Sequence, residues 1–297
     1  MPQTTKRKPA KKRRRKKRRS HYSRTAAISI GIVLLFLILA FWLLGSYVRQ
    51  LTSAVSDAVP EVSVSTEPGL PPSTLSAQCF GSENGYRTYV SDTLTAKLGA
   101  DLSSHQGSID WDSLTQSPID FVILRAGYRG YTDGSINIDP SFAENLAAAR
   151  NAGLGVGVYF FSQALTTEEA EAEAQTVLSQ LADYQIDYPI YYDWEPISEG
   201  EARTDTISSS EITACAQHFC QIIENAGYKA GIYFNLDIAQ NYYHLSALQN
   251  YEFWLAEYQD TPSYPYDFGM WQYTESGTLP GVSTPVDLNL CFKAYEN

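Results

Sequence analysis

Short apolar runs alternate with helical segments over residues 97–297, and this alternation limits the possible folds more than any other feature of the chain. Eight runs are typical of strands, because each is rich in β-branched or aromatic residues and is bounded by turn residues. They are Leu98–Ser103, Phe121–Gly127, Gly155–Ser162, Tyr188–Glu195, Ala230–Asn235, Phe253–Tyr258, Phe268–Thr274 and Val286–Cys291. Strands that alternate with helices form right-handed crossover units and a parallel sheet.

Four segments that follow the early strands have helical patterns with recognisable ends. They are Ser141–Ala152, Thr166–Asp183, Ser208–Ala226 and Asp237–Leu248. The last three strands follow one another through connections too short for full helices. We therefore expect an α/β fold in which eight strands close into a trimmed TIM-like barrel over residues 97–297, with helices on the early strands and none between the last three.

The charge of the chain is divided sharply between its N-terminus and the rest. Thirteen of the 22 Lys and Arg residues precede Thr25, although the whole chain has a net charge of −11. The residues between Arg24 and Arg49 carry no charge, and a helix of that length would be about 36 Å long, enough to cross a membrane core. The sequence therefore predicts a basic cytoplasmic tail at 1–24, a transmembrane signal-anchor helix at 25–48, and an extracellular remainder at the cell membrane.

Two other interpretations of the N-terminus stay open. A secretory signal peptide could be cleaved near Thr52–Ala54, although the apolar run is longer than a typical signal core. The basic tail could bind nucleic acid, although membrane topology and attraction to anionic lipid explain the same charges. We expect the tail and anchor to contact membrane lipid, and we expect the barrel to bind no nucleic acid.

Residues 49–96 are interpreted as a linker and pre-barrel segment. The part up to about residue 75 is rich in Ser, Thr, Pro and Val and has no sustained apolar period. Such a composition is typical of a flexible linker. The linker would hold the barrel away from the bilayer.

The cysteines and histidines form no recognisable metal-binding pattern, so we expect neither a metal nor a cofactor. Cys215 and Cys220 fall in a helical stretch and are expected to be packed thiols. Cys79 precedes the first strand and Cys291 ends the last one. A closed barrel that joins its ends could therefore bring these two together in a disulfide.

Acidic residues lie at the ends of three predicted strands, where the reactive groups of such barrels gather. Asp193 and Glu195 are two positions apart, so on a pleated strand both side chains point to one face, about 6 to 7 Å apart. Asp101 lies in the first strand and Asp287 in the last, and barrel closure makes these strands neighbours. Repulsion between such carboxylates keeps one of them protonated, which suits general acid/base catalysis on a glycosidic bond.

Aromatic residues in or near the strands suit stacking against sugar rings, although about half of them are expected to belong to the core. We expect the substrate to contact eight residues of these strands. They are Tyr128, Tyr159, Trp194, Tyr233, Asn235, Trp254, Trp271 and Gln272.

Eight blocks of this sequence, in order, resemble glycoside hydrolase family 25, the Chalaropsis-type lysozymes or N-acetylmuramidases. The blocks are Asp101–Trp111, Phe121–Arg129, Gly157–Ser162, Tyr191–Glu195, Gly231–Asn235, Phe253–Ala256, Met270–Tyr273 and Val286–Asn289. A single block would be weak evidence, whereas eight in the family's order are specific and span nearly all of residues 97–295.

The resemblance implies hydrolysis of the β-1,4 bond between N-acetylmuramic acid and N-acetylglucosamine in peptidoglycan, on a trimmed TIM-like (β/α)5(β)3 barrel. By the family's motif, Glu195 is the general acid/base. Asp193 orients the substrate's acetamido group if the reaction retains configuration through an oxazolinium-like intermediate, and inversion stays open. Asp101 and Asp287 match the family's two further site aspartates.

Two other functions are compatible with an acidic barrel. A non-catalytic wall scaffold would keep the barrel only to bind glycan, and a related amidase or acetylhexosaminidase would give different products. The four intact carboxylates favour the muramidase. Its partner would be peptidoglycan, and we expect the protein to be a monomer.

Overall fold

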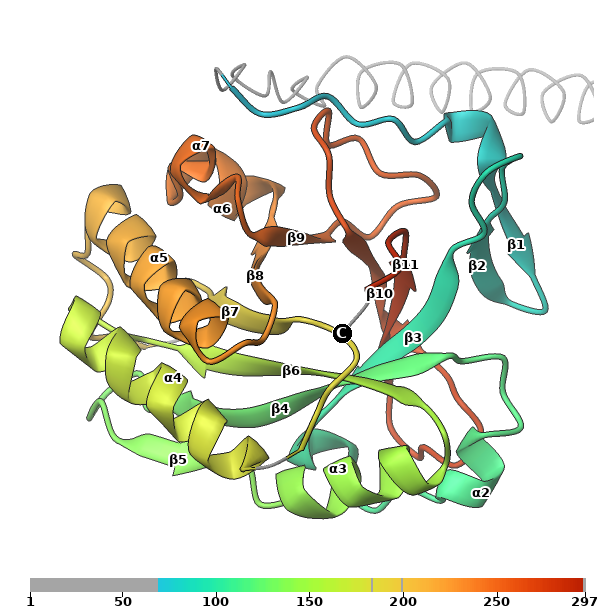
Figure 1. Ribbon diagram of the computed structural model, residues 1–297, viewed down its shortest axis with the longest axis horizontal. Coiled ribbons are helices and arrows are strands. Elements are labelled where there is room, and N and C mark those ends of the chain that lie inside the picture. Colours follow the sequence, from blue (N-terminus) through green and yellow to red (C-terminus); the bar gives the residue numbers. More distant parts are fainter. Residues whose placement is uncertain (1–68, 183, 199, 296–297) are drawn as a thin grey trace, which may run out of the picture. The chain divides into compact units, whose positions relative to one another are not determined.

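The computed structural model describes residues 69–182, 184–198 and 200–295 (Figure 1). The predicted basic tail and membrane anchor lie outside these ranges. Within the described ranges, no helix has the length and apolar character needed to cross a membrane.

Eight strands close into a barrel, which confirms the predicted architecture. Around the barrel they follow the order β3, β11, β10, β9, β8, β7, β6 and β4, and β4 pairs again with β3. Their bounds are β3 Lys97–Leu102, β4 Phe121–Arg129, β6 Gly155–Ser162, β7 Ile190–Trp194, β8 Ala230–Asn235, β9 Glu252–Ala256, β10 Met270–Gly277 and β11 Val286–Cys291.

The barrel is mixed rather than wholly parallel. Strand β11 runs antiparallel to both β10 and β3, whereas the other barrel pairs are parallel. The short connection after β10 explains this, because a parallel neighbour would need a crossover of a dozen or more residues. A short strand that the sequence did not reveal, β5 (Ile136–Ile138), pairs antiparallel with the end of β4.

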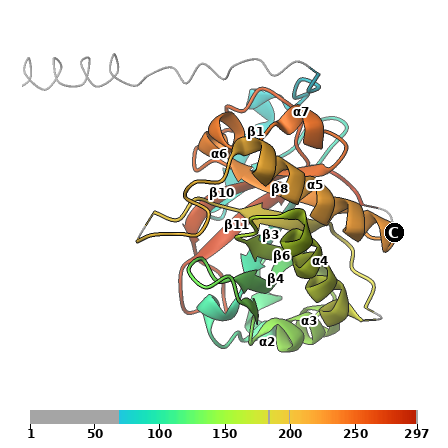
Figure 2. The ribbon, with the colours of Figure 1, turned by 90° about the vertical axis from the view of Figure 1, so that its left-hand side faces the viewer.

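Three long helices cover the outside of the early strands, and the second and third of them pack side by side (Figures 1 and 2). They are α3 (Phe142–Asn151), α4 (Thr167–Leu181) and α5 (Ser209–Asn225). The side chain of Thr166 caps α4, and Ser208 forms a capping box with Glu211 at the start of α5. These bonds satisfy backbone N–H groups that have no partner inside the helix.

The predicted fourth helix is divided in two. Helix α6 (Leu236–Asn241) ends before α7 (Leu245–Leu248) begins. A single turn, α2 (Trp111–Leu114), follows β3 and the 3-10 turn η2 (Ser104–Gln106). The last three strands carry no helix of comparable length, as the trimmed barrel predicted.

Side chains of the barrel strands alternate between two apolar layers. Those facing out pack under the helices, and those facing in form a smaller core that includes Phe121, Tyr191 and Met270. Glycines make room for the large inner rings, since a Cβ at Gly99 would collide with Phe121 and a Cβ at Gly231 with Tyr191. The closed end of the barrel is therefore filled, and a substrate can enter only from the other end.

The pre-barrel segment that follows the predicted linker is folded, whereas most of the linker itself lies outside the described residues. The 3-10 turn η1 (Ala77–Cys79) leads into a hairpin of β1 (Phe80–Glu83) and β2 (Tyr86–Tyr89). Phe80 packs edge-on against Trp271 and, with Tyr89, against Phe292. The hairpin therefore covers the outer face of the barrel where helices are missing.

The predicted disulfide between Cys79 and Cys291 is wrong, because all four cysteines are free thiols. Cys291 points into the inner core of the barrel, while Cys79 packs against the outer core. The wall of the barrel therefore separates the two sulfur atoms. Cys215 and Cys220 are buried in α5, as predicted for packed thiols.

Candidate active site

Four carboxylates gather at the open end of the barrel. Asp101 pairs directly with Asp287 across the β3–β11 ladder, which is the neighbouring arrangement that barrel closure predicts. Asp193 is on the inward face of β7, and Glu195 follows on the same side just beyond the strand's end. Burial raises the pKa of Asp101, and burial together with the charges of neighbouring carboxylates raises the pKa of Asp193, Glu195 and Asp287.

Two amide side chains hold Asp101 in place. Its Oδ2 accepts hydrogen bonds from Asn289 Nδ2 at 2.8 Å and from Gln272 Nε2 at 3.1 Å. Asn289 in turn accepts a hydrogen bond from Trp254 Nε1 at 2.8 Å. Gln272 also donates to Asp287 at 3.5 Å, so one amide bridges the two aspartates of neighbouring strands.

The side-chain amide oxygen of Gln272 also has two hydrogen-bond partners. Its Oε1 accepts hydrogen bonds from the hydroxyls of Tyr233, at 3.0 Å, and Tyr258, at 2.9 Å. With both donors on the oxygen, the amide nitrogen must face the aspartates. The network therefore fixes the orientation of the Gln272 side chain without a bound ligand.

Burial and mutual repulsion keep the site partly protonated. Burial, with the charges of Asp101 and Glu275, raises the pKa of Glu195 to about 7. Burial and the nearby charge of Asp101 raise the pKa of Asp287 to about 8. The pKa of Asp193 is raised well above its usual value by burial and then by Glu195. Near neutral pH, this end of the barrel therefore holds acidic protons that exposed carboxyl groups would have lost.

One carboxylate oxygen of Asp193 makes no hydrogen bond to the described residues. Its side chain is 6% exposed, and its Oδ1 has no hydrogen-bond partner among the described residues. A buried polar atom without a partner is costly unless another group binds it. The vacant oxygen can accept a hydrogen bond from an N–H group of a ligand.

The sequence analysis missed Arg125, the cation of this site. It lies on β4, donates from Nε to Asp139 Oδ2 at 2.8 Å, and approaches the ring of Tyr128 at 5.4 Å. Its positive charge lowers the pKa of Asp193 and so offsets part of the repulsion there. The alternation of β4 was the available signal, because it puts Arg125 on the same face as Ile123.

Comparison with known proteins identifies this barrel. The sequence model described as glycosyl hydrolases family 25 matches residues 100–282, which is more than half of the chain. The chain belongs to glycosyl hydrolases family 25.

Three relatives illustrate the family likeness. The autolytic lysozyme of Clostridium acetobutylicum is 26% identical over 192 residues, covering 64% of this chain and 54% of that protein. The autolysin LytC of Streptococcus pneumoniae has a TM-score of 0.58 at 24% identity, covering 71% of this chain and 51% of LytC. The spore cortex lytic enzyme SleM of Clostridium perfringens has a TM-score of 0.55 at 25% identity, covering 66% and 67% of the two chains. The chain thus spans about half the length of the first two relatives.

Most of the predicted substrate contacts lie at or near the open end of this family 25 barrel. Tyr233 and Trp254 face inward with ring centroids 4.9 Å apart, and Tyr159 lies beside Trp254 at 6.1 Å. Tyr128 lies at the end of β4 beside Arg125. Asn235 ends β8, where its Oδ1 accepts a hydrogen bond from the Ile238 backbone N–H and starts α6.

Two of the predicted contacts face away from the site. Trp194 is 1% exposed and packs against Tyr242 outside the barrel. Trp271 is fully buried on the outer face, where its Nε1 donates to the Glu257 carbonyl at 2.8 Å. Neither ring can reach a substrate inside the barrel mouth, because each neighbours an inward-facing residue on its strand and so points to the opposite side.

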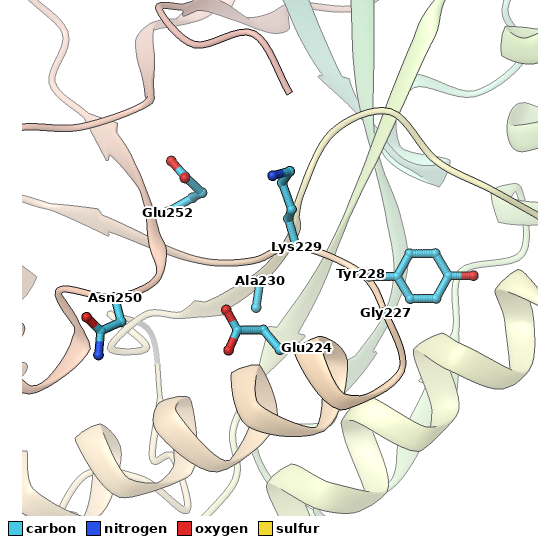
Figure 3. Close-up of a pocket in the computed structure, with 7 residues that line it drawn as sticks. All are labelled: Glu224, Gly227, Tyr228, Lys229, Ala230, Asn250 and Glu252. Carbon is cyan, nitrogen blue, oxygen red and sulfur yellow. The ribbon is translucent and has the colours of Figure 1, made fainter. Parts of the chain in front are cut away.

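A pocket at the other end of the strands is separate from this site (Figure 3). It lies between the end of α5 and the starts of β8 and β9. Its lining residues are Glu224, Gly227, Tyr228, Lys229, Ala230, Asn250 and Glu252. Because this is the N-terminal end of the strands, we assign the pocket no part in catalysis.

Proposed function

We propose that this barrel is a lysozyme-type muramidase that hydrolyses the β-1,4 bond between N-acetylmuramic acid and N-acetylglucosamine in peptidoglycan. The proposal depends chiefly on Glu195, whose pKa is raised to about 7 beside a second buried acid at the barrel mouth. A carboxyl group that keeps its proton near neutral pH can donate it to the leaving glycosidic oxygen. Family membership and the autolytic lysozyme of Clostridium acetobutylicum support the same reaction class.

The four carboxylates take different roles in this proposal. Glu195 protonates the leaving oxygen and later removes a proton from the attacking water. The free Oδ1 of Asp193 accepts the N–H of the substrate's acetamido group, whose carbonyl oxygen attacks the anomeric carbon to give an oxazolinium-like intermediate with retention. This substrate-assisted route differs from the usual pair of carboxylates. Asp101 and Asp287 shape the charge of the site.

Sugar binding falls to the groups that surround the carboxylates. The rings of Tyr128, Tyr159, Tyr233 and Trp254 offer stacking faces or edges, and Asn235 offers its amide. Gln272 acts through the site residues that it bonds, because its own amide already bonds Tyr233, Tyr258, Asp101 and Asp287. LytC of Streptococcus pneumoniae has been solved with a synthetic peptidoglycan ligand, which supports peptidoglycan as the polymer for this barrel too.

Release of soluble material from purified peptidoglycan tests this function against a non-catalytic wall scaffold. A muramidase clears a suspension of wall fragments and leaves reducing sugar ends in solution. A scaffold would sediment with the fragments and release nothing. Binding without release, by protein that is folded, would favour the scaffold.

The pH dependence of kcat/KM should reflect the raised pKa of Glu195. Because the general acid must be protonated, we expect kcat/KM to fall as the pH rises through about 7, the raised pKa of Glu195. Glu275→Gln should move this fall to lower pH, since the charge of Glu275 helps to raise that pKa. Rates measured from about pH 5 to about pH 9 check both points, and a fall near the ordinary glutamate value would contradict the assignment.

We propose that residues 1–24 form a cytoplasmic tail and 25–48 a single-pass anchor, with the barrel outside the cell as a monomer. The charge partition of the sequence supports this layout. Fractionation of cells that express the whole chain tests it, since the protein should stay with membranes at high salt and the barrel should be cut by external protease. A protein in the soluble fraction would contradict the anchor.

A further inference from the structure

A polar groove lies beside the barrel mouth, between the β1–β2 hairpin and the end of β10. It has a volume of about 600 Å³ and is lined by residues that include Arg87, Tyr258 and Asp260. The hairpin precedes residues 100–282, the part that matches the family. This groove is therefore built in part by a segment outside the residues that match the family model.

Tyr258 connects the groove to the carboxylates. Its side chain is 48% exposed, and its hydroxyl donates to Gln272, the residue that also bonds Asp101. A polymer whose reacting sugar lies over Asp101 and Glu195 would thus pass Tyr258 as it leaves the barrel mouth. The groove then receives whatever group the polymer carries next to that sugar.

Arg87 is the only cation among the residues that line the groove. It pairs with Asp260, whose side chain is 88% exposed. An ion pair this open to water contributes little stability, so a ligand carboxylate can replace Asp260 at small cost. The planar guanidinium is suited to bind such a group through two parallel hydrogen bonds.

The barrel carries a large excess of acidic residues, so an accessible cation such as Arg87 matters for binding an anionic group of the substrate. Residues 97–297 contain 7 basic and 28 acidic residues. Four of these seven cations, Arg125, Arg129, Arg203 and Lys293, already pair with acids of the barrel. The other three lie at the start of β3, near the end of α3 and before β8, at the end of the barrel opposite the mouth. A carboxylate of the substrate is repelled over most of this surface and finds an accessible positive partner at Arg87.

We propose that this groove is a subsite for the peptide stem of peptidoglycan, with Arg87 binding a free carboxylate of that peptide. The inference depends on the proposed function. The lactyl carboxyl group of muramic acid is consumed in the amide bond to the stem, so the stem carries the free carboxylates. The subsite therefore favours wall strands that keep their peptides and positions the glycan through them.

Two soluble wall substrates test the subsite with the full-length protein: one with free stem carboxylates and one with the same groups converted to amides. We expect Arg87→Gln to raise KM about five- to tenfold on the first substrate, with kcat little changed, and to leave KM on the second within about twofold. On the wild type, amidation should raise KM by a similar factor. Asp260→Asn removes the competing carboxylate and should keep or lower KM on the first substrate.

Lys229→Gln is the matched control, because it removes the same charge at the opposite end of the barrel (Figure 3). It should leave both KM values unchanged. If Arg87→Gln raises KM equally on both substrates, or on neither, the subsite is wrong while muramidase action stands. If the wild type cleaves neither substrate, the proposed function fails and the subsite fails with it.

Discussion

Glu195→Gln is expected to lower kcat on peptidoglycan by about 10³-fold, because general acid catalysis contributes about 10² to 10⁴. Gln has nearly the same shape as Glu but has no acidic proton to donate to the leaving oxygen. The site keeps Asp193 and its aromatic walls, so binding of wall fragments should change little. Initial rates and sedimentation with fragments measure the two effects separately.

Glu224→Gln is the control for this substitution. Glu224 is exposed at the end of α5 and lines the pocket at the opposite end of the barrel, so its variant removes one negative charge far from the mouth and should keep the wild-type rate. If Glu195→Gln retains more than about a tenth of the activity, the general acid must be another group. If binding is lost together with the rate, the substitution has damaged the groove and not only the chemistry.

Asp193→Asn is expected to lower kcat by about 10²-fold without destabilising the fold. Asn keeps the shape of the side chain but cannot ionise, so it cannot supply the negative charge that Asp193 gains by losing its proton when a cationic intermediate forms beside it. Burial raises the pKa of Asp193, so the native side chain holds a proton that the unfolded chain releases above its ordinary pKa of 3.8. Asp193 therefore makes the wild type lose stability as the pH rises above that value, and the Asn variant lacks this contribution.

The free energy of unfolding at pH 7 should thus be equal or higher for Asp193→Asn, while activity falls. Denaturant titrations at about pH 5 and about pH 8 should show the difference growing with pH. Asp92→Asn is the control, because Asp92 is exposed, and neither activity nor stability should change. A variant that is inactive because it is unfolded, or that keeps full activity, would contradict the role given to Asp193.

The barrel itself could be predicted because its pattern repeats along the chain. Strands β6, β8 and β11 begin and end at the predicted residues, and the other five differ by a few residues at their ends. Closure of the barrel predicts that Asp101 and Asp287 lie beside each other, and the β3–β11 ladder confirms it. What the apolar pattern could not decide was the direction of β11, which depends on connection length.

The errors at the site come from ignoring the two-residue period of strands. Trp194 lies between Asp193 and Glu195, and Trp271 lies next to Gln272, so neither tryptophan can share a face with its neighbours. Applying the same alternation would have excluded both rings and added Arg125. For these residues, the position along the strand predicts which way a side chain faces, and the aromatic type of the residue does not.

The folded hairpin was missed although it carries a recognised signal. Asn84 and Gly85 both have positive φ values, and Asn-Gly is the favoured pair for a two-residue hairpin turn. The Ser- and Pro-rich linker ends at about residue 75, and the sequence analysis predicts no secondary structure between it and the barrel. The wrong prediction of a Cys79–Cys291 disulfide has a different cause. Barrel closure indicates that the first and last strands are neighbours, but it does not indicate which side of the barrel wall each thiol faces.

The identity of the new reducing ends tests the central claim most directly. Purified peptidoglycan digested by the protein, and by Glu195→Gln beside it, is reduced with borohydride and analysed by mass spectrometry. The account predicts muropeptides that end in reduced N-acetylmuramic acid with the wild type and almost none with the variant. Ends in reduced N-acetylglucosamine, released peptides without new sugar ends, or equal products from both proteins would contradict it.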